Sequence, residues 1–133
     1  MGREESSLSN LAAELNSSFT TCDVLEENFC EKIINDLNDE PIDGLAFCVG
    51  SIDLKPLKLT KKSDFMQSFN LNLISATEVI RSLADNLKKN KGSIILFSTV
   101  AVKQGFPNHA IVSSAKGAIE GLTLALAAEF APN

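Results

Sequence analysis

Two short apolar runs on either side of a long helical stretch constrain the fold of this chain more than any other feature. The runs are residues 44–50 and 93–97. A short uninterrupted apolar run is typical of a parallel strand that is covered on both faces. Between them, apolar residues step by three or four positions, at Phe65, Phe69, Leu73, Ala76, Ile80, Leu83 and Leu87. This spacing predicts one continuous helix from an N-cap at Thr60 to Asn90. A strand, a helix and a second strand in this order predict a βαβ unit with a parallel sheet.

Weaker patterns on both sides extend this arrangement. Residues 4–15 and 26–37 have the apolar stripes of helices, and residues 17–22 predict a short strand. A further helix is expected at 111–130, a segment rich in small residues. We therefore predict a single α/β domain over residues 1–133, with a parallel sheet and flanking helices.

Charge and hydropathy exclude several classes of partner. The chain has 12 Lys and Arg against 17 Asp and Glu, which gives a net charge of −5. Nucleic acid and anionic membrane surfaces both attract clustered basic residues, so neither is an expected partner. The start has no signal-peptide core, and no apolar run reaches the roughly 18–20 residues that span a bilayer. These observations predict a cytoplasmic protein without a membrane segment.

The cysteines and the histidine do not form a metal-binding pattern. Cys22, Cys30 and Cys48 are odd in number and lack Cys-x-x-Cys spacing, and they accompany a single histidine, His109. This argues against a disulfide framework and against a zinc site. We predict no metal, and we expect the three thiols to be buried as small hydrophobic side chains.

The stretch 92–123 carries the most specific signal. It reads GSIILFSTVAVKQGFPNHAIVSSAKGAIEGLT and resembles the second half of a short-chain dehydrogenase/reductase. In that family a strand ends on a hydroxyl residue, and a helix then carries Tyr-x-x-x-Lys. By this register Thr99 takes the place of the catalytic serine, Lys116 that of the lysine and Val112 that of the tyrosine. Valine cannot exchange a proton, so a contribution of roughly 10²–10⁴ in rate must come from elsewhere or be absent.

The resemblance implies roles for several further side chains. Thr99 would hold a carbonyl oxygen, and Lys116 would bind a ribose and supply a local positive field. Asn72, in FNLNLISA, matches a helix asparagine that links the lysine to a water relay. His109, three residues before Val112, is a candidate for the missing proton because imidazole titrates near neutrality, but a solvated loop histidine is the alternative.

A cofactor, NAD or NADP, follows from the same resemblance. Asp23 and Val24 match residues that contact the adenine ring, although Asp23 equally suits an N-cap for the helix 26–37. Gly50 is the one residue retained from the family's Asn-Asn-Ala-Gly. Arg3 lies where a basic residue often meets the 2′-phosphate of NADP, and an exposed arginine in a first helical turn is the alternative.

The glycine-rich turn that holds the pyrophosphate in this family is absent from the sequence. The chain begins where the second strand would end, and it stops before the segment that completes the substrate pocket. We therefore expect a partial Rossmann-like, doubly wound sheet and little dinucleotide affinity for these 133 residues. The chain is then a piece of a longer protein, or strand 17–22 pairs directly with strand 44–50, or a partner completes the sheet.

Two functions are consistent with these patterns. The first is an NAD(P)-dependent oxidoreductase for a small carbonyl or alcohol substrate, truncated or degenerate and with altered catalysis. The second is a non-catalytic binding or scaffold protein on the same fold. Family members commonly pair helices equivalent to 60–90 and 111–130 across a two-fold axis, so either protein is expected to be a homo-oligomer.

Overall fold

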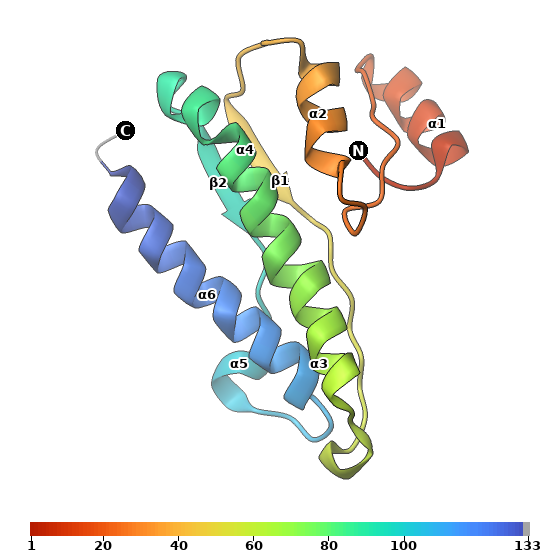
Figure 1. The fold of residues 1–133 in the computed structure, drawn as a ribbon, viewed down its shortest axis with the longest axis vertical. Coiled ribbons are helices and arrows are strands. Elements are labelled where there is room, and N and C mark those ends of the chain that lie inside the picture. The colour runs from red at the N-terminus through yellow and green to blue at the C-terminus, as the bar shows by residue number, and fades with distance from the viewer. Residues whose placement is uncertain (132–133) are drawn as a thin grey trace. The chain divides into compact units, whose positions relative to one another are not determined.

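The structure is a computed structural model that describes residues 1–131. The chain divides into two compact units, Met1–Glu40 and Pro41–Asn133. Figure 1 shows the helices and strands of both. Each unit is described by itself below.

The first unit contains two helices, α1 (Glu5–Leu15) and α2 (Phe29–Leu37). The predicted strand 17–22 is wrong in extent, because only an isolated parallel bridge between Gly2 and Thr21 forms there. The Gly2 N–H donates to the Thr20 carbonyl at 3.2 Å, and the Cys22 N–H donates to the Gly2 carbonyl at 2.8 Å. A strand needs a neighbour along its whole length, and here a single residue supplies both bonds.

The second unit contains the predicted parallel sheet. Strands β1 (Gly44–Phe47) and β2 (Ser93–Leu96) pair in parallel, in a register that runs from Gly44 opposite Ser93 to Phe47 opposite Leu96. The described sheet consists of these strands alone, so residues 17–22 are not part of it. The α/β class and the βαβ order are confirmed.

The expectation that both strand faces are covered is wrong. Phe47 is 3% exposed, whereas Ile95 is 54% exposed and Ala46 is also exposed. Successive side chains of a strand point to opposite faces, so one face of this sheet is covered and the other is open. On the covered side, Ile94 and Phe130 help to line an apolar cavity of about 190 Å³ between β2 and the last helix.

The predicted helix 60–90 is continuous, but it contains a π-helical turn. It comprises α3 (Lys62–Phe69), a π segment (Asn70–Ile74) and α4 (Ser75–Lys89), and a 3₁₀ turn (Leu57–Leu59) precedes it. The N-cap is Lys61 rather than Thr60, because the Asp64 carboxylate accepts the Lys61 N–H at 2.7 Å. The apolar stripe did not reveal the π turn, since all three helical parts keep nearly the same direction (Figure 1).

Two helices follow β2, the short α5 (Ala101–Gln104) and the long α6 (Ala110–Phe130), which confirms the predicted helix 111–130. The buried residues of α6 are Ile111, Val112, Ala115 and Ile119. By length and composition α6 is apolar enough to cross a membrane. The sequence prediction of no such segment missed this helix, because its apolar residues are interrupted by polar ones. Core helices of soluble proteins have the same length and composition.

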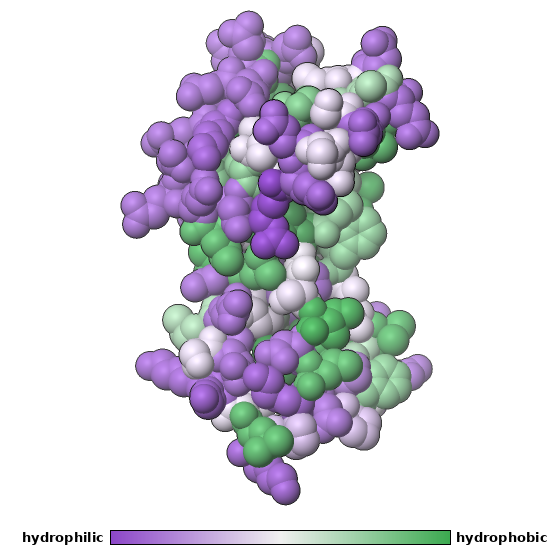
Figure 2. Space-filling view, turned by 90° about the vertical axis from the view of Figure 1, so that its right-hand side faces the viewer, coloured by the Kyte–Doolittle hydropathy of each residue, from purple (hydrophilic) through white to green (hydrophobic). Residues whose placement is uncertain are grey.

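Several apolar side chains remain on the surface. Figure 2 shows them as green patches among hydrophilic side chains on the face that it draws. The segment that follows β1 runs along the right-hand side of Figure 1, the side that Figure 2 draws. It exposes Ile52, Leu54, Leu57 and Leu59. Cys48 is exposed and Cys30 is partly exposed, so the prediction of three buried thiols holds for Cys22 alone. No cluster of metal-ligating side chains occurs within the described part of the chain.

Candidate functional site

Three residues that the sequence singled out meet in the second unit. Gly50 follows β1, Asn72 lies in the π segment and Lys116 lies on α6. A Cβ atom added to Gly50 would lie 2.6 Å from Asn72 Oδ1 and 3.3 Å from Lys116 Nζ. Real Cβ atoms essentially never show the 2.6 Å contact, so a larger residue at position 50 would have to displace the Asn72 amide. We call these residues the Asn72–Gly50–Lys116 cluster.

Hydrogen bonds fix the orientation of the Asn72 amide. Asn72 is 1% exposed, and its Nδ2 donates to the Ser68 carbonyl at 2.9 Å and to Ser68 Oγ at 3.3 Å. A carbonyl only accepts, so the amide nitrogen must face Ser68 and Oδ1 must point toward Gly50. Oδ1 is buried and, within the described residues, has no hydrogen-bond partner. An unpaired buried acceptor is uncommon and marks a place where a donor is expected.

Ser68 is a site residue that sequence reasoning missed. It is 4% exposed, and it lies four residues before Asn72, on the same helix face. Two polar residues at this spacing on the buried side of a helix were the available signal.

Lys116 is the charged member of the cluster. It is half-buried, and no ion pair with its ammonium occurs among residues 1–131. Burial lowers the pKa of the Lys116 amine below its ordinary value of 10.5, because desolvation disfavours the charged form. A cation without a counterion beside an unpaired acceptor is suited to bind hydroxyl groups of a ligand.

The hydroxyl residues after β2 have local partners. Thr99 is half-buried, and its Oγ1 accepts the Ala101 N–H at 3.3 Å at the start of α5. The Thr99 hydroxyl keeps its own proton for donation to another group. Ser98 Oγ, which sequence reasoning did not select, donates to Glu120 Oε1 at 2.7 Å. Within the described chain, no hydrogen bond joins Thr99 to Lys116 or Asn72.

Val112 and His109 occupy different environments. Val112 is 2% exposed, one helical turn before Lys116. His109 is the N-cap residue of α6, where its Nδ1 donates to the Pro107 carbonyl at 2.8 Å and its ring lies 5.4 Å from that of Phe106. These contacts hold the imidazole on its own loop, and no contact joins it to the Asn72–Gly50–Lys116 cluster among the described residues.

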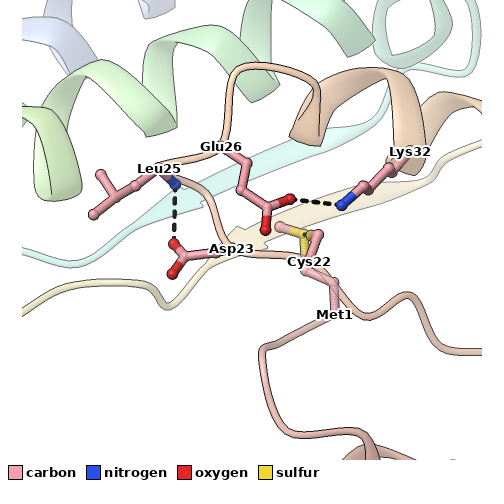
Figure 3. A network of polar contacts seen from close by, with 6 residues as sticks. All are labelled: Met1, Cys22, Asp23, Leu25, Glu26 and Lys32. Carbon is pink, nitrogen blue, oxygen red and sulfur yellow. Dashed lines mark hydrogen bonds and ion pairs between the residues drawn. The ribbon is translucent and has the colours of Figure 1, made fainter.

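Asp23, in the first unit, forms a turn rather than a helix cap. Its Oδ1 accepts the Leu25 N–H at 3.0 Å (Figure 3). Helix α2 begins later and has Asn28 as its N-cap. Of the two alternatives for Asp23, the N-cap of the helix is therefore wrong, and the adenine contact stays a prediction. Arg3 Nη1 lies 3.8 Å from Asp23 Oδ2, with the arginine side chain 79% exposed. Val24, the other expected adenine contact, is buried.

The rest of the network in Figure 3 is local to the first unit. Lys32 Nζ donates to Glu26 Oε2 at 2.6 Å, and Cys22 Sγ lies 3.7 Å from Met1 Sδ. Burial raises the pKa of the Cys22 thiol, so this cysteine is a poor nucleophile. The turn at Asp23 is thus held by backbone and surface polar contacts, without a reactive group.

Comparisons with known proteins agree with this geometry. The family model described as enoyl-(acyl carrier protein) reductase matches residues 1–133. Hydroxynaphthalene reductase arp2 of Aspergillus fumigatus is 41% identical over 81 residues, which make up 61% of this chain and 29% of that protein. A solved short chain dehydrogenase/reductase family protein has a TM-score of 0.90 and 24% identity, with 99% of this chain and 57% of that chain covered.

A second solved structure includes a cofactor. It is a gluconate 5-dehydrogenase from Burkholderia cenocepacia J2315 in complex with NADP and tartrate, with a TM-score of 0.87 and 23% identity. The match covers 98% of this chain and 55% of that enzyme. The chain thus spans about half of these solved structures and a smaller share of the fungal reductase.

Proposed function

Because the chain belongs to the short-chain dehydrogenase/reductase family, we propose that the protein carrying it is an NAD(P)-dependent oxidoreductase with altered catalysis. Its substrate would be a small carbonyl or alcohol compound. The Asn72–Gly50–Lys116 cluster carries this proposal, since it joins a buried acceptor, an open glycine and an unpaired cation. The cluster lies past the carboxyl end of β1, the edge at which open α/β sheets bind ligands.

The residues of the Asn72–Gly50–Lys116 cluster fit the ribose of a nicotinamide dinucleotide. Lys116 offers N–H donors for ribose hydroxyls, and Gly50 leaves room beside it. Asp23 and Val24 would contact the adenine, and the gluconate 5-dehydrogenase solved with NADP supports the cofactor class. When bound, the dinucleotide supplies a hydride. The side chains of this chain would then orient the substrate, and the Thr99 hydroxyl would hold the carbonyl oxygen by donating a hydrogen bond to it.

The proposal extends to assembly and location. The two compact units would be parts of one Rossmann-like domain in a homo-oligomer, as the family match over residues 1–133 supports. Apolar side chains on the long helices are available for a contact between copies, including Met66, Ile74 and Leu124, which are 52%, 48% and 74% exposed. The family favours a location in the cytoplasm. The net charge of −5 disfavours binding to nucleic acid or to an anionic membrane surface.

One observation favours the second candidate, a non-catalytic binding protein. Val112 replaces the residue that exchanges the proton in the family, and His109 is bound to its own loop. A protein of this kind would bind the dinucleotide and still transfer no hydride.

Titration separates these functions. The complete protein is titrated with NADPH and NADH by fluorescence, and dinucleotide oxidation is then followed with a panel of ketones and aldehydes. Binding with turnover supports the oxidoreductase, whereas binding without turnover supports the second candidate. Absence of binding overturns both. Gly50→Ala is the matched variant, because its added Cβ would collide with Asn72 Oδ1 and should weaken binding.

A further inference from the structure

The proposed reaction moves a proton as well as a hydride, and position 112 has no group for the proton. Lys116 lies one helical turn further on, and residues i and i+4 share a helix face. We propose that the Lys116 amine itself exchanges the proton with the substrate oxygen, directly or through one water. This inference rests on the proposed function. This role goes beyond binding a ribose and supplying a field.

Geometry places the amine at the edge of the sheet where a ligand is expected. Lys116 Nζ lies 3.3 Å from the position of a Cβ on Gly50, past the carboxyl end of β1. The Val112 side chain has no hydrogen-bond donor, so it does not bind the substrate oxygen in place of the amine. Gly50 and Asn72 have no ionisable side chain, so the amine is the ionisable group of the cluster.

Asn72 supplies the complementary acceptor. Its amide nitrogen is held by Ser68, so Oδ1 faces the same point as Lys116 Nζ. An acceptor in that place can hold the amine, or a bridging water, in both protonation states, because both ammonium and neutral amine retain N–H donors. Ser68 is thereby a positioning residue for Asn72.

Among residues 1–131, no counterion holds Lys116 in its charged form. The helix α6 packs against α3, the π segment and α5. The titratable groups on these elements and on nearby turns of α6 are Lys62, Asp64, Lys103, His109 and Glu120. Asp64 pairs with Lys55 at 3.1 Å, and Glu120 accepts the hydroxyl proton of Ser98. Within the described residues none of them pairs with Lys116, and burial moves the pKa of its amine toward working pH.

The step balances as follows. In the reducing direction the carbonyl carbon receives a hydride from NAD(P)H, and the C=O π electrons move onto oxygen. The Lys116 ammonium gives that oxygen one proton. The alcohol, NAD(P)⁺ and a neutral Lys116 amine result, and a proton from solvent restores the ammonium. The oxidising direction is the reverse.

Lys116→Arg tests this role in the complete protein. Arginine keeps the positive charge and N–H donors but does not release its proton at working pH, so dinucleotide affinity should stay within about threefold. Single-turnover hydride transfer to the best ketone of the panel should fall by about 100-fold or more. Lys103→Arg, on the exposed surface of α5, is the matched control and should leave the rate unchanged.

A second variant distinguishes proton transfer from a structural role. Val112→Tyr places a phenol one turn before Lys116, and in that background Lys116→Arg should reduce the rate much less than in the wild type. An equal loss in both backgrounds overturns the inference, as does a Lys116→Arg single variant that keeps its rate.

An independent readout does not need turnover. In ¹⁵N-lysine spectra of the dinucleotide-bound protein, the resonance lost in Lys116→Arg should titrate below 10.5. Titration at or above that value overturns the inference and leaves the proposed function standing. A wild-type protein that transfers no hydride removes the proposed function, and this inference with it.

Discussion

The two halves of α6 are both rich in apolar residues but lie in different environments. The first half buries Ile111, Val112, Ala115 and Ile119, and it holds Lys116 beside the cluster. In the second half Leu124 is 74% exposed. The difference shows that packing of α6 against α3 and the π segment, rather than hydropathy along the helix, creates the environment that shifts the Lys116 pKa.

The largest effect is expected from truncation of one apolar residue in each half. Ile119 is 3% exposed, so Ile119→Ala should lower the free energy of unfolding by about 2–5 kcal/mol. Its matched control is Leu124→Ala, which should change the stability of the dissociated chain by less than about 0.5 kcal/mol because the side chain is exposed there. Urea unfolding of both variants checks the comparison.

Leu124→Ala also reports on assembly. If a second copy covers the outer half of α6, the variant loses stability in a concentration-dependent manner, and sedimentation shows dissociation. A stability change of equal size in both variants at every concentration would contradict the contrast between the two halves.

The next largest effect is expected at Gly50. Gly50→Ala would place a methyl group 2.6 Å from Asn72 Oδ1, and we expect a loss of about 1–3 kcal/mol through overpacking. The matched glycine is Gly121 in the second half of α6, where an added Cβ meets no atom within 4 Å. Gly121→Ala should therefore stabilise the helix by about 0.5–1 kcal/mol. Thermal unfolding measures both, and destabilisation by Gly121→Ala would reveal a close helix contact there.

Much of the second unit could be predicted from sequence, because its patterns are periodic. The stripe from Phe65 to Leu87 and the two apolar runs gave the βαβ order correctly. Two features could not be read in this way. The π turn leaves the stripe almost unchanged, and the exposure of Ile95 depends on which segments cover the sheet.

The candidate site was predictable where a motif fixes a register. Lys116, Asn72 and Gly50, which the resemblance singled out, come from three separate elements and meet in the structure. Their roles stay predictions. Ser68 was missed although its spacing from Asn72 places both on one helix face, because the spacing does not show that the Asn72 amide nitrogen bonds to Ser68. The strand at 17–22 was overestimated because propensity does not say how long a neighbour is available.

The smallest effect concerns the charge of Lys116 and depends on pH. Its folded-state pKa lies below 10.5, so the unfolded chain binds more protons between these two values. Stability of the wild type should therefore rise with pH through that window. Lys116→Met removes the buried cation, so it should be more stable than the wild type at neutral pH, and its advantage should shrink as pH approaches 10.5. Lys103→Met, on the exposed surface of α5, controls for the loss of a surface charge. Parallel curves of stability against pH for the wild type and Lys116→Met would show that the first half of α6 does not desolvate its lysine. The contrast between the two halves of α6 would then rest on packing alone.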